Sequence, residues 1–227
     1  MCGASKKSPA MARVVPAILE RDEQTFRKRV ATIASHLGED PLIQIDVLDG
    51  TMLPGRSFGD PAAVAALRLA TPFEAHLMVN DPEEAAREWT RAGARRVVVH
   101  LEAKGNLGLA LERIRHDDRV PGMALNPDTD LRALDEFIPF IHYILVMGVS
   151  PGGQGRGFVP ETVDRVRALR RAYPDRIIGV DGGVTDRNHL ARTLARAGAD
   201  DLIVGSAIWR ADDPLAAYRS LVTDAHT

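Results

Sequence analysis

The sequence predicts an α/β fold, a closed (β/α)8 TIM barrel, for residues 13–227. Short β-branched runs alternate with amphipathic helical stretches at intervals of roughly 25 to 30 residues, which is typical of βαβ units and a parallel sheet. There are eight such runs, and no linker or shift in composition between them indicates a second domain. An open, doubly wound sheet is the alternative.

The expected strands are runs of aliphatic and β-branched residues. In chain order they are residues 13–19, 42–48, 73–79, 95–101, 121–126, 143–149, 176–183 and 201–207.

The segments between the strands carry helix signals. After Asp22, apolar residues recur at helical spacing, and Gly38 is expected to end that helix in the left-handed conformation. In residues 80–93, Asp81 can cap a helix, Pro82 can occupy its first turn, and Gly93 can end it.

Composition restricts the class of partner. The chain has 227 residues and a formal net charge of −2 with mixed signs, so we expect no nucleic-acid partner and a small-molecule substrate. A single cysteine, Cys2, indicates a reducing, cytoplasmic location. We expect residues 1–12 to form a disordered tail, and we expect no signal peptide, no membrane span and no membrane partner. A homo-oligomer is left open.

Polar side chains face the interior of the predicted barrel. Alternation within residues 42–48 places Gln44, Asp46 and Leu48 on one face, and the opposite, aliphatic face can meet helices. The polar face is therefore expected to line the barrel.

The same alternation turns His76 and Met78 inward, and Asp181 ends the seventh expected strand. The second and seventh strands are three steps apart around an eight-strand circle, so Asp46 and Asp181 are expected to approach a ligand from nearly opposite sides. That placement suits proton removal on one face of a carbon and delivery on the other. With His76 they could also hold a divalent cation. Each residue alone could be an ordinary polar group of the barrel mouth, but their convergence favours a site.

Glycine-rich turns follow the last three expected strands. They read SPGGQGRGF (150–158), DGGV (181–184) and VGSAI (204–208). Adjacent backbone N–H groups at this rim are a common phosphate site in (β/α)8 barrels, so we expect phosphate binding there.

From Val15 to Trp209 the chain resembles the ribulose-phosphate 3-epimerase family, in the segments VPAIL, IDVLDG, AHLMV, VVHLEA, ALNPDT, LVMGVSPG, VDGGV and VGSAI. The resemblance implies a ribulose-phosphate-binding barrel that interconverts D-ribulose 5-phosphate and D-xylulose 5-phosphate in the pentose phosphate pathway. It implies that Asp46 and Asp181 are the acid/base pair. It also implies a metal ion bound by two histidines and these two aspartates, which polarises the C2 oxygen of an enediolate.

The resemblance also assigns residues around the substrate. Met78 and Met147 match pocket methionines, and Leu48 stands where a third is usual. The substrate and its phosphate would contact His76 and backbone of the three glycine-rich turns, namely Gly152, Gly153, Gln154, Gly155, Gly182, Gly183, Gly205 and Ser206. His100 matches a family position, and we expect it to be a buried, hydrogen-bonded histidine without a ligand role.

Two departures from the family pattern concern the site. The family's HVDVMDG has its first metal histidine where this chain has Gln44, and the substrate-contacting serine of PSIL is Ala17. His76 matches the second metal histidine. Gln44 is a doubtful ligand: it could complete the metal's shell through its amide oxygen, or it could instead hydrogen-bond a metal-bound water or Asp46. In either case we expect weak zinc binding and a response to manganese, magnesium or iron(II).

Three functions are therefore compared. The first is an active 3-epimerase, favoured by Asp46 and Asp181. The second is a non-catalytic or weakly active sugar-phosphate-binding relative, favoured by Gln44 and Ala17. The third is an enzyme of another sugar phosphate, such as an allulose 6-phosphate epimerase or a hexulose-phosphate aldolase of similar fold.

Overall fold

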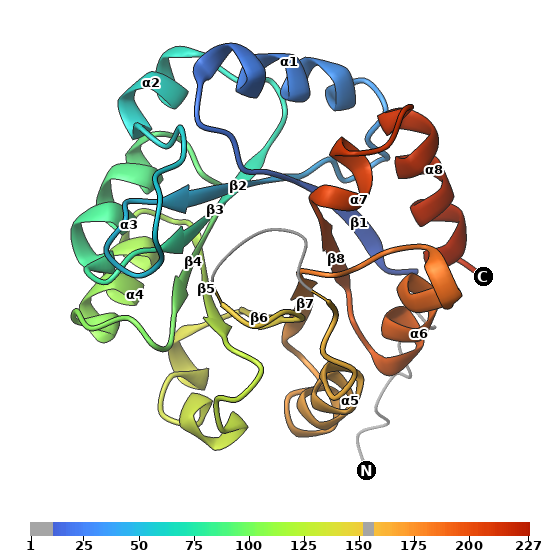
Figure 1. Cartoon of the computed structure of the whole chain (residues 1–227). Helices are drawn as coiled ribbons and strands as arrows, with labels where there is room; N and C mark the ends of the chain where they lie inside the picture. The colour runs from blue at the N-terminus through green and yellow to red at the C-terminus, as the bar shows by residue number, and fades with distance from the viewer. Residues whose placement is uncertain (1–10, 152–156) are drawn as a thin grey trace.

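Eight parallel strands close into a barrel in the computed structural model, which describes residues 11–151 and 157–227 (Figure 1). The strands are β1 (Arg13–Ile18), β2 (Ile43–Leu48), β3 (Phe73–Met78), β4 (Arg96–His100), β5 (Val120–Leu125), β6 (Tyr143–Met147), β7 (Ile177–Asp181) and β8 (Asp201–Val204). Closure comes from β1, which pairs with β8 from Arg13↔Asp201 to Pro16↔Val204. The predicted barrel is confirmed, and the open sheet is wrong.

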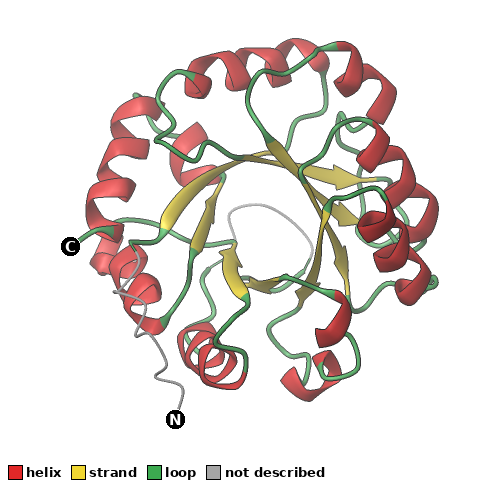
Figure 2. Cartoon of the chain, turned by 180° about the vertical axis from the view of Figure 1, so that it is seen from behind, coloured by secondary structure: helices red, strands yellow, loops and turns green. Residues whose placement is uncertain are grey.

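Helices surround the barrel as an outer ring (Figure 2). They are α1 (Glu23–Ala34), α2 (Pro61–Ala66), α3 (Pro82–Arg91), α4 (Leu107–His116), α5 (Thr162–Ala172), α6 (Leu190–Ala197), α7 (Ser206–Trp209) and α8 (Pro214–Ala225), with 3-10 turns η1 (Leu131–Leu134), η2 (Ile138–Phe140) and η3 (Arg187–His189). Between β5 and β6 only the short turns η1 and η2 occur. This segment contains Pro127 and Pro139, which lack the N–H that a longer helix would need.

The helix ends agree in part with the sequence signals. Asp22 caps α1 by accepting a bond from the Thr25 N–H, but α1 ends at Ala34 and Gly38 does not take the left-handed conformation. In α3, Pro82 occupies the first turn and Gly93 follows the helix at φ +100°. The Asp81 carboxylate makes no capping hydrogen bond, so that expectation is wrong.

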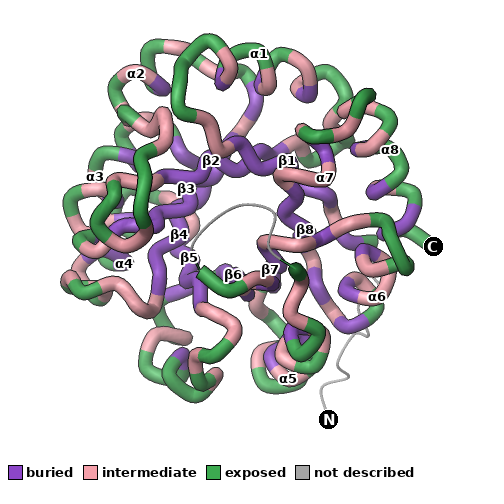
Figure 3. The backbone as a smooth tube through the Cα atoms, viewed as in Figure 1, coloured by how far each residue is buried: buried purple, intermediate pink, exposed green. Residues whose placement is uncertain are grey.

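The strands carry two apolar layers. Ile43, Ile45 and Val47 belong to the outer layer between sheet and helices, whereas Ala17 and Ile203 belong to a smaller inner cluster. Figure 3 shows the strands buried and the outer sides of the helices exposed. The inward placement of Gln44 and Asp46 thus follows from the two-residue period of β2.

The N-terminal end of the barrel contains a buried ionic network that was not predicted from the sequence. Arg96 pairs with Glu74, donates to Asp201 at 2.8 Å, and lies with its Cζ atom 3.4 Å from the ring centre of Tyr143. Arg13 donates two further bonds to Asp201, at 2.9 and 3.0 Å. Because both acids are almost completely buried, the arginines compensate charges that would otherwise be very costly.

Most of the expected tail, residues 1–10, lies outside the described residues. Met11 is exposed and Ala12 is buried immediately before β1. In the part of the chain that the structure describes, no helix combines the length and apolar character needed to cross a membrane.

Candidate active site

A cavity of about 150 Å³ opens at the C-terminal ends of the strands. Side chains or backbone from β1, β2, β3, β4, β6, β7 and β8 line it, among them Ala17, Asp46, Leu48, His76, Met78, His100, Met147, Asp181, Gly182, Gly183, Gly205 and Ser206. Every described residue to which the sequence assigned a site role lies here, with the exception of Gln44, which is buried directly beneath Asp46 on β2. Gly152, Gly153, Gln154 and Gly155 lie outside the described residues.

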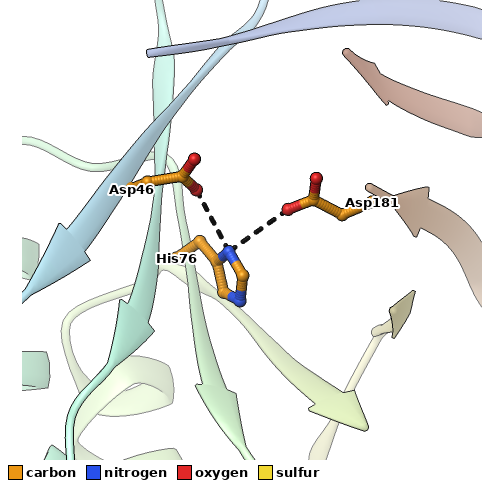
Figure 4. A group of neighbouring side chains, drawn as sticks. All are labelled: Asp46, His76 and Asp181. Carbon is orange, nitrogen blue, oxygen red and sulfur yellow. Dashed lines mark hydrogen bonds and ion pairs between the residues drawn. The ribbon is translucent and has the colours of Figure 1, made fainter. Parts of the chain in front are cut away.

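Two aspartates meet at one nitrogen of His76 at the floor of the cavity. His76 Nδ1 lies 3.1 Å from Asp46 Oδ1 and 3.3 Å from Asp181 Oδ2 (Figure 4). Asp46 is the direct register partner of His76 on the neighbouring strand, and Asp181 reaches the same atom from β7. In Figure 4 the second oxygen of each carboxylate points away from the histidine. The cluster therefore has two carboxylates, from β2 and β7, that converge on one imidazole nitrogen.

The electrostatics of this cluster follow from burial and short contacts. Burial alone would lower the pKa of His76, but the hydrogen bonds and charges of Asp181 and Asp46 outweigh it and raise that pKa to about 10. Burial raises the pKa of Asp46, and the nearby Asp181 charge raises it further, against the opposing effect of His76 and Gln44. At neutral pH the histidine therefore carries a positive charge between the two acids.

Gln44 is completely buried and is hydrogen-bonded to both acids. Its Nε2 atom donates to Asp46 Oδ1 and to Asp181 Oδ2, each at 2.7 Å, and lies 3.3 Å from His76 Nδ1. The sequence reading anticipated a contact with Asp46. The contact with Asp181 depends on closure of the barrel and could not be read from the sequence.

A second histidine of the cavity lining, His100, contacts His76. His76 Nε2 and His100 Nε2 are 2.8 Å apart, and His100 Nδ1 lies 3.1 Å from Glu102 Oε2. His100 is 4% exposed, in agreement with the expected buried, hydrogen-bonded residue. Glu102 was not predicted; its position two residues after His100, just past the end of β4, was the only available signal. Its other oxygen accepts from the Asn126 N–H at 2.8 Å.

Three of these side chains have a spacing that fits a divalent ion. Asp46, His76 and Asp181 each offer one ligand atom, and the three atoms lie within 4.8 Å of one another. Two carboxylates and an imidazole are suitable ligands for zinc, manganese or iron(II). Gln44, in contrast, turns hydrogens rather than a lone pair toward this point.

Two of the glycine-rich turns lie at the rim of the cavity. Gly182 and Gly183 have φ angles of +97° and +71°, and a Cβ atom at Gly182 would lie 2.6 Å from a Val149 methyl group. Glycine is therefore needed there to form the turn. The third turn differs slightly from expectation, because β8 ends at Val204 and α7 begins at Ser206.

The apolar residues that the resemblance assigned also line the cavity. Leu48, Met78 and Met147 lie at the ends of β2, β3 and β6. Ala17, at the serine position of the family pattern, contributes a methyl group, and its carbonyl accepts from Trp209 Nε1 at 2.6 Å.

Comparisons with known proteins agree on the relatives of this chain. The model of the "Ribulose-phosphate 3 epimerase family" matches residues 13–209. A ribulose-phosphate 3-epimerase of Chlamydia muridarum is 37% identical over 179 residues, which are 75% of this chain and 77% of that protein. A ribulose-phosphate 3-epimerase of Aquifex aeolicus is 32% identical over 217 residues, 93% of this chain and 96% of that one.

Solved structures show the same fold at lower identity. The 3-hexulose-6-phosphate synthase of Salmonella typhimurium superposes with a TM-score of 0.72 at 17% identity, covering 94% of this chain and 98% of the other. This likeness concerns the barrel.

Proposed function

The chain belongs to the ribulose-phosphate 3-epimerase family, a family of carbohydrate isomerases, and on this premise we propose that it inverts carbon 3 of D-ribulose 5-phosphate to form D-xylulose 5-phosphate. The observation that carries the proposal is the pair of carboxylates, Asp46 and Asp181, facing each other across the floor of the cavity. The barrel of residues 13–227 serves as the catalytic domain, and the reaction is placed in the cytoplasm as part of the pentose phosphate pathway.

Inversion of a carbon next to a carbonyl requires one group to remove a proton and another to return a proton from the opposite face. Asp46 and Asp181 stand on β2 and β7, three strands apart in the closed barrel, and so reach a bound sugar from different sides. We therefore assign Asp46 and Asp181 as the acid/base pair, one removing the C3 proton and the other returning a proton from the opposite side. The roles exchange in the reverse reaction.

The enediolate formed by proton removal needs positive charge or hydrogen-bond donors near its oxygens. His76 is the cationic side chain between the two acids, and its bonds to both hold them in place. With the Nδ1 proton of His76 lost, Asp46, His76 and Asp181 would hold one divalent ion, manganese, magnesium, iron(II) or zinc, and such an ion would supply charge against the developing oxyanion.

The substrate phosphate is assigned to the rim formed by Gly182, Gly183, Gly205 and Ser206. Two facts support this assignment: the segments adjoin on neighbouring strands, and they line the same cavity as the aspartates. Small residues in such turns allow a phosphate to approach the backbone N–H groups. Leu48, Met78 and Met147 would then enclose the carbon chain and exclude water from the reacting carbon.

The deciding experiment follows carbon 3 directly. Purified protein is incubated with ribulose 5-phosphate in D2O, with added Mn²⁺, Zn²⁺ or EDTA, and the C3 proton is observed by NMR. Solvent exchange at C3 together with formation of xylulose 5-phosphate is the expected result. The same incubation of an Asp46→Asn, Asp181→Asn double variant is the control for contaminating activity.

The contact of Gln44 with both acids favours one alternative, a relative that binds sugar phosphates without turnover. Binding of ribulose 5-phosphate without exchange at C3 in any of the three incubations would establish that alternative. Exchange with a six-carbon ketose phosphate but not with ribulose 5-phosphate would assign a different substrate to the same chemistry.

A further inference from the structure

The Gln44 amide and His76 share the same two carboxylate oxygens. Asp46 Oδ1 and Asp181 Oδ2 each face His76 Nδ1 and each accept a hydrogen from Gln44 Nε2. Both amide hydrogens are therefore used, one on each acid. A single neutral side chain links two acids that come from β2 and β7.

Chemistry determines which way the amide is turned. The reverse orientation would place Gln44 Oε1 in short contact with two carboxylate oxygens, an arrangement that repels. As it stands, Oε1 is buried and has no hydrogen-bond partner among the described residues. A buried acceptor without a partner is unfavourable, but bonds from one amide to two carboxylates are of the stronger, charge-assisted kind. The two bonds therefore outweigh the unpaired oxygen.

The same two oxygens are needed by a metal ion. Ligand oxygens lie about 2.0–2.2 Å from zinc, and the space beside Asp46 Oδ1 and Asp181 Oδ2 is taken here by N–H hydrogens. An amide nitrogen offers no lone pair to a metal, because its electron pair is delocalised into the carbonyl. The hydrogen-bonded amide and a bound cation are therefore alternatives.

We propose that the Gln44 amide is a built-in substitute for the cation: it bridges Asp46 and Asp181 in the metal-free protein and competes with any divalent ion for them. Gln44 is thus a positioning residue that weakens metal binding instead of completing the metal's ligand set. The inference rests on the proposed site, but it concerns metal binding rather than turnover. Metal binding can therefore disprove it while the epimerase function stands, and an absence of epimerase activity would leave it intact.

The metal affinity of Gln44 variants tests whether Gln44 weakens or strengthens metal binding. Zinc and manganese binding is measured by isothermal titration calorimetry on the wild type, on Gln44→Met, which has similar length and no polar hydrogens, and on Gln24→Met, an exposed control in α1. We expect Gln44→Met to bind both ions at least ~10-fold tighter than the wild type, since loss of one competing hydrogen bond to a charged group is already worth roughly tenfold. Gln24→Met should match the wild type.

Metal binding by Gln44→Met that equals or is weaker than that of the wild type would overturn the proposal. Weaker binding is expected if the Gln44 oxygen is a metal ligand, and equal binding is expected if Gln44 does not affect the metal. Gln44→His serves as the positive control, since an imidazole adds a zinc ligand. If zinc binds Gln44→His but neither the wild type nor Gln44→Met, the amide is not the competitor and the proposal also fails.

A second measurement needs no folded Gln44→Met. The chain has three glutamines, Gln24, Gln44 and Gln154, so the Gln44 side-chain amide can be assigned in ¹⁵N spectra by its loss in Gln44→His. In metal-free wild type its two hydrogens should exchange with water at least ~10-fold more slowly than those of Gln24. Saturation with zinc should shift both signals and speed their exchange. Signals that stay unchanged when zinc binds, or that exchange as fast as Gln24 without metal, would overturn the inference.

Discussion

The Nε2 atoms of His76 and His100 lie 2.8 Å apart, with the rings stacked at a centroid distance of 5.0 Å. Only one hydrogen fits between them. Since the acids hold His76 in its charged form and burial lowers the pKa of His100, His76 donates and neutral His100 accepts. The hydrogen of His100 is then on Nδ1, where it is donated to Glu102. Glu102 thereby sets the tautomer of a residue that orients the site histidine.

Glu102→Gln should reduce stability at neutral pH. Burial raises the pKa of Glu102, but bonds from His100, Thr129 and the Asn126 N–H outweigh it and lower that pKa to about 2, from an ordinary 4.5. A lowered pKa in the folded state contributes stability above pH 4.5 that is lost as pH falls toward 2. We expect urea unfolding to show that Glu102→Gln lowers the free energy of unfolding by about 2 kcal/mol at pH 7, a figure already reduced for the partial exposure of Glu102.

The difference between Glu102→Gln and wild type should shrink as pH is lowered from 4.5 toward 2, and exposed Glu136→Gln should show no such trend. A difference independent of pH would mean that Glu102 is not ionised in the folded protein.

Asp46→Asn and Asp181→Asn should each lower turnover of ribulose 5-phosphate by at least ~10²-fold, because each removes a positioned acid or base. Circular dichroism should show an intact fold. Asp175→Asn, an exposed residue just before the opposite end of β7, is the matched control and should keep wild-type turnover. Either site variant with near-normal turnover would exclude that aspartate from the acid/base pair.

Gly205→Val should raise the KM for the sugar phosphate at least ~10-fold and change kcat less, through loss of charge-assisted phosphate bonds. A Cβ atom at Gly205 meets only ordinary contacts at 3.8 Å from Ala17 among the described residues, so the barrel should tolerate the branch while the phosphate rim is crowded. Gly108→Val in α4, away from the cavity, is the control. An unchanged KM in Gly205→Val would contradict the phosphate assignment. A sulfate ion that binds elsewhere on the rim in a soaked crystal would contradict it as well.

Arg96→Met should destabilise the barrel by about 3–5 kcal/mol, because Glu74 and Asp201 would lose a buried partner. Arg95→Met, on the neighbouring exposed residue that pairs with Asp40, should cost less than about 1 kcal/mol. Chemical denaturation of both variants makes the comparison. If Arg96→Met and Arg95→Met both lowered the free energy of unfolding by similarly small amounts, the Arg96 network would contribute little to stability.

Several features of the fold and the site were determined by the sequence alone. The β-branched runs, their spacing and their number predict the barrel, and the two-residue period predicts that Asp46 and His76 point inward. The step count between the second and seventh strands predicts that Asp181 joins them. These properties are local or depend on chain order, so they can be read without coordinates.

Only the tertiary structure decided what these side chains bind. Gln44 reaches an acid 137 residues away, and Arg13 reaches one 188 residues away, through contacts that exist only once β1 meets β8 and the barrel closes. The direction of the Gln44 amide, the link from His76 through His100 to Glu102, and the ionic network under the barrel all depend on which donors and acceptors meet inside it. Residue type and spacing determine where a side chain points, but hydrogen bonding between distant strands depends on ångström-scale distances that packing alone sets.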